Sequence, residues 1–289
     1  MCENNYKKVR LILWVILFAN LAVAAVKIFV GTACGSRSVI ADGVHSLSDG
    51  TSNIVGLIGI RLASRPADKG HPYGHKRFEI LASLFIGAML AFMSVQVFCN
   101  AVKSFGRAAA PVPDKIQIIL MLAALAVNIV VASTEYRLGR RLESAVLVAD
   151  SMHTVSDIFI SCGVLTGLLC IRAGLPYWVD SLMSACVAAV VFVSACRIIS
   201  GSLKTLADSA AADAEEIEKI ALTVPGVHSV HKIRSRGGDG QIFIDLHVVT
   251  APGESIVYGH ELSHALEKTL CGRFGDKTQV CVHIEPDNL

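Results

Sequence analysis

Six long apolar segments constrain this chain more than any other feature. They cover approximately residues 10–33, 38–62, 78–104, 114–137, 143–171 and 177–200. About 20 apolar residues are enough to cross the hydrocarbon core of a bilayer as a helix, and a spanning segment must satisfy its backbone hydrogen bonds internally. We therefore predict an all-α transmembrane bundle of six helices in a lipid bilayer. The first segment is too long for the apolar part of a signal peptide, so we interpret it as a retained span.

Composition supports a membrane protein and argues against a nucleic-acid partner. Of the 289 residues, 53% are hydrophobic and 17% are charged, and the mean hydropathy is +0.56. A net charge of +2 is too small to indicate nucleic-acid binding. The nine cysteines form no C-x-x-C pair, which argues against a thiolate metal site.

Positive charges predict how the chain crosses the membrane. Basic residues concentrate at the N-terminus and in the loops after the second and fourth segments: Lys7, Lys8, Arg10, Arg61, Arg65, Lys69, Lys76, Arg77, Arg137, Arg140 and Arg141. Loops rich in lysine and arginine stay on the cytoplasmic side. We expect both termini to be cytoplasmic.

Two apolar segments carry the same polar motif. The pattern A-D-x-x-H-[ST]-x-S-D occurs at 41–49 and again at 149–157. On a helix, a histidine and an aspartate four residues apart lie on one face, about one turn from each other. Ionisable residues inside a membrane usually serve function, and two imidazoles with two carboxylates make the ligand set of a tetrahedral zinc site. The candidate ligands are His45, Asp49, His153 and Asp157.

Each motif also contains an aspartate three residues before its histidine. These residues, Asp42 and Asp150, either accept a hydrogen bond that orients the imidazole or serve as helix-end or interhelical hydrogen-bonding groups. The second role is favoured, so we leave both residues outside the ligand set.

The loop between the second and third segments contains a further set of metal-type ligands. Asp68, His71 and His75 are separated by glycine and proline, which let the backbone turn these side chains together. Histidine and aspartate suit a zinc-type ion. The alternative, a solvated polar loop with two incidental histidines, stays open.

From about residue 206 the chain changes character. Residues 1–205 form the predicted transmembrane domain, and 206–289 form a small cytoplasmic α+β domain of ferredoxin-like αββαβ order. Its expected elements are a helix at 211–222, strands at 227–235 and 241–250, a helix at 255–270 and a strand at 278–285. Six of the ten histidines lie here, a density that indicates metal binding: His228, His231, His247, His260, His264 and His283.

These features together resemble the cation diffusion facilitator family of divalent-metal exporters over roughly residues 8–286. The resemblance implies a homodimer that exchanges cytoplasmic metal for protons by alternating access, in a bacterial inner membrane. It places the transport site on His45, Asp49, His153 and Asp157, and a loop site on Asp68, His71 and His75. It places a cytoplasmic binuclear site on His231, His247, His260, His283 and Glu285, and a charge interlock on Arg77 and Asp208.

The resemblance implies export of a divalent metal, for which we expect zinc, and physical chemistry supports its coupling to protons. Two carboxylates in a low-dielectric interior cannot both stay ionised when the metal leaves, so the empty site should take up protons. Histidine at position 45 resembles the zinc-restricted members of the family, and zinc is expected in the cytoplasmic site as well. Efflux of iron, cobalt or cadmium, or a membrane metal sensor or scaffold that transports nothing, are the alternatives. We do not expect an enzyme, since no apolar segment carries an H-E-x-x-H motif.

Overall fold

The computed structural model describes residues 3–33, 37–104, 115–172, 178–238 and 241–287, and the side chains at 42, 45 and 49 lie outside this description. The chain divides into two compact units, Met1–Ser202 and Leu203–Leu289.

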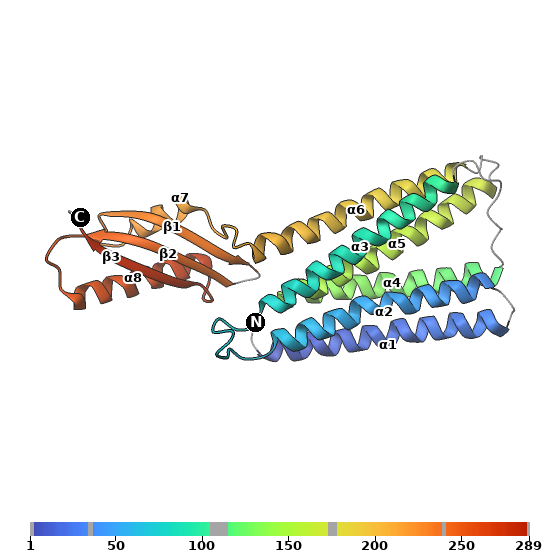
Figure 1. Cartoon of the computed structure of the whole chain (residues 1–289), viewed down its shortest axis with the longest axis horizontal. Helices are drawn as coiled ribbons and strands as arrows, with labels where there is room; N and C mark the ends of the chain where they lie inside the picture. Colours follow the sequence, from blue (N-terminus) through green and yellow to red (C-terminus); the bar gives the residue numbers. More distant parts are fainter. Residues whose placement is uncertain (1–2, 34–36, 105–114, 173–177, 239–240, 288–289) are drawn as a thin grey trace. The chain divides into compact units, whose positions relative to one another are not determined.

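The first unit consists of long helices (Figure 1), and all six predicted segments are helical. They are α1 (Glu3–Ala33), α2 (Arg37–Ala63), α3 (Arg77–Ser104), α4 (Lys115–Leu142), α5 (Ala145–Arg172) and α6 (Trp178–Leu206). Each has 27 to 31 residues, or about 40 Å at 1.5 Å per residue. Within the described residues, all but α2 are also apolar enough to cross a membrane. The first half of α2 holds the polar motif, which lowers its hydropathy.

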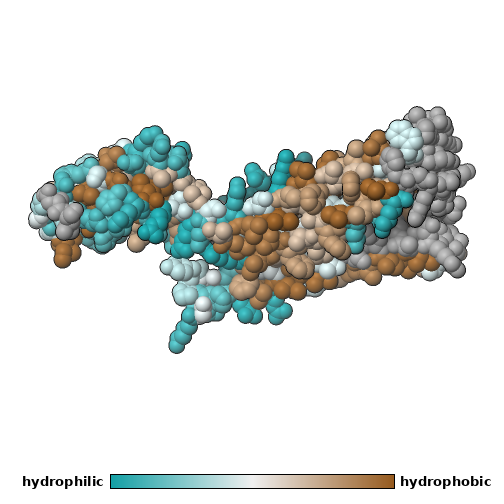
Figure 2. Space-filling model, turned by 45° about the horizontal axis from the view of Figure 1, so that its top comes forward, coloured by the Kyte–Doolittle hydropathy of each residue, from teal (hydrophilic) through white to brown (hydrophobic). Residues whose placement is uncertain are grey.

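The helices pack through apolar side chains at one end of the bundle. Leu13 of α1, Ile60 of α2, Ile86 of α3 and Leu147 of α5 are fully buried in one cluster. Large apolar side chains such as Phe18, Phe29, Phe85, Phe92 and Val130 point outward. Figure 2 shows this apolar surface along the helices, which suits contact with lipid.

The second unit is a three-stranded sheet with two helices on one face. Its elements are α7 (Ala214–Ala221), β1 (Ser229–Gly238), β2 (Gln241–Thr250), α8 (Ile256–Phe274) and β3 (Gln279–Pro286), in the expected αββαβ order. The strand order is β1-β2-β3, with β1 antiparallel and β3 parallel to β2, because α8 carries the chain back across the sheet.

Side-chain alternation gives this sheet two different faces. Ile244, Leu246 and Val248 of β2 are buried against Leu262 and Leu266 of α8. The residues between them point to the opposite face, which the helices leave uncovered. That face carries the strand histidines.

Candidate functional site

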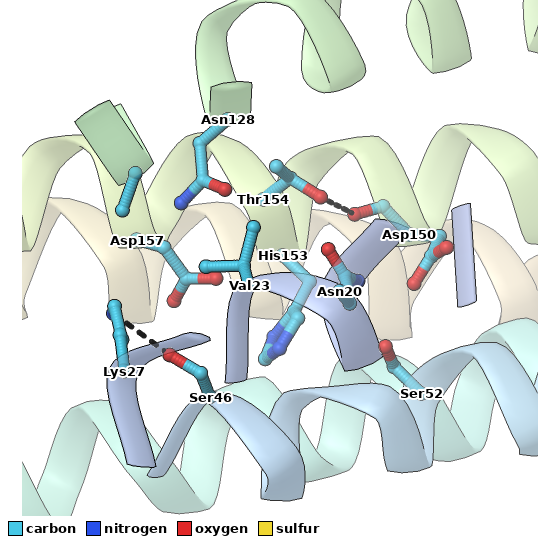
Figure 3. A pocket seen from close by; sticks show the side chains of 11 residues that line it. Asn20, Val23, Lys27, Ser46, Ser52, Asn128, Asp150, His153, Thr154 and Asp157 are labelled. Atoms are coloured by element: carbon cyan, nitrogen blue, oxygen red, sulfur yellow. Dashed lines mark hydrogen bonds between the residues drawn. The ribbon is translucent and has the colours of Figure 1, made fainter. Parts of the chain in front are cut away.

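The motif on α5 places a histidine and an aspartate inside the helical bundle. His153 is 4% exposed, and it lines a cavity of about 40 Å³ together with Asp157. The other lining side chains come from four helices, with Asn20, Val23 and Lys27 from α1, Ser46 and Ser52 from α2, Ala124 and Asn128 from α4, and Asp150 and Thr154 from α5. Figure 3 shows these polar groups converging around His153. A cavity of this size and polarity has room for an ion or a few waters.

His153 and Asp157 also line a second, smaller cavity. It measures about 10 Å³ and is bounded by Leu90 and Ser94 of α3 and Val191 of α6. The two candidate ligands therefore separate a cavity against α1, α2 and α4 from one against α3 and α6.

The second half of the predicted transport site lies on α2. The side chains of His45 and Asp49 lie outside the described residues, so a meeting of all four ligands stays a prediction. Two neighbours in sequence, Ser46 and Ser52, do line the cavity of His153 and Asp157.

A chain of buried hydrogen bonds connects the helices around this cavity. Asn20 donates to Asn53 Oδ1 over 3.0 Å, and Asn53 Nδ2 donates to Asp150 Oδ2. Thr154 Oγ1 donates to Glu135 Oε2 over 3.0 Å, which adds α4 to the set. Asp150 thus has the interhelical role that the sequence favoured, while Asp42 lies outside the described residues.

Several polar groups near the cavity were not expected from the sequence. Glu135 is fully buried, and Lys27 is 7% exposed with its Nζ donating to Ser46 Oγ over 2.9 Å. Figure 3 shows Lys27 and Asp157 at the same end of the cavity, so a lysine and an aspartate side chain share it. Glu135 and Lys27 are ionisable residues inside apolar segments, and this feature could have identified them from the sequence.

The loop between α2 and α3 brings its predicted ligands together. His71 Nδ1 lies 3.4 Å from Asp68 Oδ1, and His75 Nε2 lies 3.3 Å from Asp68 Oδ2. The second ring nitrogen of His75 contacts the Pro66 carbonyl oxygen at 3.1 Å, which holds the ring and leaves Nε2 toward Asp68. The backbone N–H of His71 donates to Asp68 and holds the pKa of that carboxyl below its ordinary value. One ligand atom from each residue lies within 4.8 Å of the others.

A second cluster lies on the open face of the C-terminal sheet. His231, His247 and His283 are directly paired across β1, β2 and β3. Glu285 Oε1 lies 2.7 Å from His247 Nδ1, and Glu285 Oε2 lies 3.1 Å from His231 Nε2. His283 Nε2 is 3.5 Å from Glu285 Oε1. The carboxylate at the centre of three imidazoles is a geometry that can hold one or two divalent ions.

His260, the remaining predicted ligand of this cluster, lies on α8. Its imidazole packs against His264, with ring centroids 4.4 Å apart. His260 and His283 both line a groove of about 570 Å³ beside β3. His264 is one of the six histidines of this domain but not one of the predicted ligands, although the letters of 260–264, H-E-L-S-H, fit H-E-x-x-H. A search for this motif outside the apolar segments would have identified His264.

Comparison with known proteins identifies the family of this chain. The model described as "Cation efflux transmembrane domain" matches residues 13–207, and the model described as "Cation efflux protein, cytoplasmic domain" matches residues 210–287. The chain belongs to the cation efflux family. This confirms the resemblance to the cation diffusion facilitators, and the protein is a cation efflux transporter and not an enzyme.

Curated relatives match along most of this cation efflux protein. An uncharacterised transporter of Methanocaldococcus jannaschii is 35% identical over 260 residues, covering 88% of this chain and 90% of the relative. The manganese efflux system protein MneP of Bacillus subtilis is 28% identical, covering 98% and 97%. The cation-efflux pump FieF of Shigella boydii is 27% identical, covering 90% and 87%. A solved MamM C-terminal domain is 25% identical, covers 26% of this chain and 92% of its own, and has a TM-score of 0.24.

The charge interlock of this cation efflux protein stays a prediction, since Arg77 and Asp208 belong to different units. Within the second unit, Arg236 lies 3.7 Å from Asp208 Oδ2. Asp208 also has a positive φ of 52°, which marks a sharp change of chain direction after α6.

The lowered pKa of Glu285 predicts how the stability of the cation efflux protein depends on pH. The hydrogen bond with His247 holds the pKa of Glu285 below its ordinary value of 4.5. A lowered pKa in the folded state stabilises the fold above the ordinary value, and this contribution is lost as the pH falls through the lowered pKa. With a chelator present, we expect the melting temperature of the full chain to fall between pH 5 and pH 3, and to fall less in Glu285→Gln. Parallel melting curves for the two proteins across this range would contradict the assignment.

Proposed function

We propose that this transporter exports zinc from the cytoplasm in exchange for protons, by alternating access, as a homodimer. The observation that carries the proposal is the position of the buried His153 and the half-buried Asp157, which both line two cavities that face different helices. A cation held there can reach one side or the other through a small movement of α3 and α6 relative to the remaining helices. A site between elements that can move against each other suits alternating access.

The choice of zinc rests on ligand chemistry. With His45 and Asp49 added from α2, the site offers two imidazole nitrogens and two carboxylate oxygens. Zinc accepts this tetrahedral set without an electronic preference for another geometry, whereas Mn²⁺ prefers more oxygen ligands. The manganese efflux relative makes manganese the main competitor, and iron, cobalt and cadmium are the further ones.

Proton coupling follows from the charge of the empty site. Asp49 and Asp157 together carry two negative charges, which a divalent ion neutralises. When the ion leaves, burial in a low-dielectric interior makes two unpaired carboxylates costly, so protons replace the metal.

The C-terminal unit supports the proposed homodimer and the proposed orientation in the membrane. Its family model is named ZT_dimer and is described as a cytoplasmic domain, which supports a homodimer with its C-terminus in the cytoplasm. An even number of spans puts the N-terminus on the same side, and the basic loops agree with this. We assign the protein to the bacterial inner membrane, with zinc also bound at the loop and the strand cluster, and with Arg77 and Asp208 interlocked.

Flux in proteoliposomes tests the metal and its exchange for protons. We would load vesicles with a zinc-sensitive and a pH-sensitive dye, and measure zinc, cadmium, manganese, iron and cobalt in the same preparation. Zinc flux with an opposing proton flux is the expected result. Manganese flux without zinc flux would overturn the zinc assignment, zinc flux without proton movement would overturn exchange, and metal binding without any flux would indicate a sensor or scaffold.

Position 45 should set the choice of metal. Replacing His45 with aspartate exchanges a nitrogen ligand for an oxygen and adds a negative charge, so the site should accept a wider set of ions. We expect His45→Asp to gain cadmium and manganese flux relative to zinc in the same vesicles. Identical ion profiles for the wild type and His45→Asp would show that residue 45 does not select the metal.

A further inference from the structure

A lysine inside the helical bundle has no place in any of the predicted ligand sets. Lys27 belongs to α1, within the stretch Asn5–Val30 that is apolar enough to cross a membrane, and it is only 7% exposed. Lysines within membrane-spanning helices are rare, and those that occur face the bundle interior or a polar cavity and pair with acidic groups. The position of Lys27 therefore indicates a function.

The side chain of Lys27 lies in the cavity of the proposed transport site. Asn20, Val23 and Lys27 recur at helical spacing on α1, and all three line the cavity that Asp157 also lines. The Nζ atom of Lys27 donates to Ser46 Oγ of α2 over 2.9 Å. Figure 3 shows Lys27, Ser46 and Asp157 at the same end of this cavity. The amino group thus shares its surroundings with a candidate metal ligand.

Ser46 also places the lysine beside the α2 half of the predicted site. It directly follows His45 and precedes Asp49 by three residues, so these three positions lie within about one turn of α2. The hydrogen bond from Lys27 fixes its amino group next to the segment that carries two predicted ligands, in a cavity lined by a third. A positive charge at this point acts on the whole ligand set, because electrostatic interactions are strong inside a bundle that excludes water.

The charge of the ligand set explains why a lysine is retained here. When ionised, Asp49 and Asp157 give the site two negative charges, and a buried carboxylate without a positive partner is costly. A protonated lysine balances one of these charges, and unlike a divalent ion it is covalently attached and cannot leave. The second carboxylate still requires a proton when the metal departs, so exchange for protons is kept. The same ammonium repels a bound divalent cation, which favours release of the metal.

We propose that Lys27 is a resident counter-ion of the transport site, which balances one carboxylate when the metal is absent and weakens metal binding enough for release. This inference rests on the proposed transport site and assigns Lys27 a role in setting its affinity. Lys27 acts through the charge it presents to the ligands and is not itself a metal ligand.

The dependence of flux on zinc concentration tests the proposal. We would compare the wild type with Lys27→Met, which keeps a long side chain and removes the charge, and with Lys27→Arg, which keeps the charge. Lys103→Met is the matched control, because Lys103 is an exposed lysine in the last turn of α3. Flux in proteoliposomes, normalised to folded protein, gives the KM for zinc and the maximal rate of each variant.

Lys27→Met should lower both quantities. Removing a like charge a few ångströms from the ion should lower the KM about 10-fold or more, and slower release should lower the maximal rate. Lys27→Arg and Lys103→Met should stay near the wild type. A purely structural link between α1 and α2 predicts instead a lower rate or yield of Lys27→Met with an unchanged KM, and that result would overturn the proposal. A raised KM in Lys27→Met, or an equal fall in Lys27→Arg, would do the same.

Zinc binding gives a second measurement that does not depend on flux. Calorimetry on the purified full chain would use a background with Asp68→Ala, His231→Ala and His247→Ala, which removes ligands from the loop and strand clusters. The heat that disappears with Asp157→Asn in this background identifies the transport site. Lys27→Met should bind this zinc ion about 10-fold or more tightly than the background protein. Absence of zinc flux in the wild type would count against export, whereas unchanged binding in Lys27→Met would count against the counter-ion.

Discussion

Replacing Asp157 with asparagine is expected to abolish metal transport. The substitution keeps the size of the side chain and removes the carboxyl group of Asp157, which lines the cavity beside His153. A neutral amide is a poor ligand for a divalent cation, and it cannot exchange a proton for the metal. Removing even an outer partner of a ligand costs about 10- to 100-fold in affinity, so the loss of a direct ligand should lower flux by more than about 100-fold. Flux in proteoliposomes, normalised to the amount of folded protein, measures it.

Asp150→Asn is the matched control on the same helix. Asp150 is buried and lines the same cavity, but its carboxylate accepts a hydrogen bond from Asn53. Asparagine can still accept that hydrogen bond, so we expect Asp150→Asn to keep a substantial part of the flux. Near wild-type flux in Asp157→Asn, or equal loss in both variants, would remove Asp157 from its role as a direct ligand.

The long helices could be predicted because lipid leaves few alternatives. A span of apolar residues in a membrane must be helical, so each of the six predicted segments is a helix, although the polar motif lowers the hydropathy of α2. The ends were harder, because hydropathy reports the part inside lipid while the helix continues beyond it. The sixth segment, expected at 177–200, runs to Leu206 through Ser202 and Lys204.

The loop cluster was predictable because its ligands are close in sequence. Asp68, His71 and His75 are held within one turn-rich segment, and local spacing almost determines that they meet. The strand cluster depends on register. The pairing of β1 shifts between His231 and Arg234, where Lys232 has a positive φ of 50°. Alternation of apolar residues does not reveal such a bulge. The sequence therefore identifies these histidines as candidate ligands but does not show which strand positions are paired.

The buried polar network could not be predicted from the sequence, because it depends on which helix faces are in contact. Asn20, Asn53 and Asp150 lie on α1, α2 and α5, far apart in the chain, and are linked by hydrogen bonds only in the bundle. Glu79 is a similar case, since it is buried at the start of α3 and accepts a hydrogen bond of 2.6 Å from Ser144. Satisfying each buried polar group requires a specific partner helix, which periodicity alone does not name.

The close approach of α2 and α3 at Gly59 gives the second large expected effect. A Cβ added at Gly59 would lie 2.3 Å from Ala82 Cβ and 3.3 Å from the Phe78 carbonyl oxygen. Small residues allow helix backbones to approach closely in membranes, and here they connect the helix that carries His45 with the helix that follows the loop cluster. We expect Gly59→Ala to force the two helices apart. The free energy of unfolding should fall by about 1–3 kcal/mol, and the flux should fall strongly.

A compensating substitution separates this packing effect from a general intolerance of alanine at position 59. Ala82→Gly removes the Cβ that the new methyl group would meet, and Ala82 is only 7% exposed, so the single variant should cost little beyond a small cavity. In the double variant the methyl group has moved from one helix to the other and the contact is relieved. We therefore expect Gly59→Ala with Ala82→Gly to recover most of the melting temperature and zinc flux that Gly59→Ala loses. Additive losses in this double-mutant cycle would mean that α2 and α3 do not pack at these two residues.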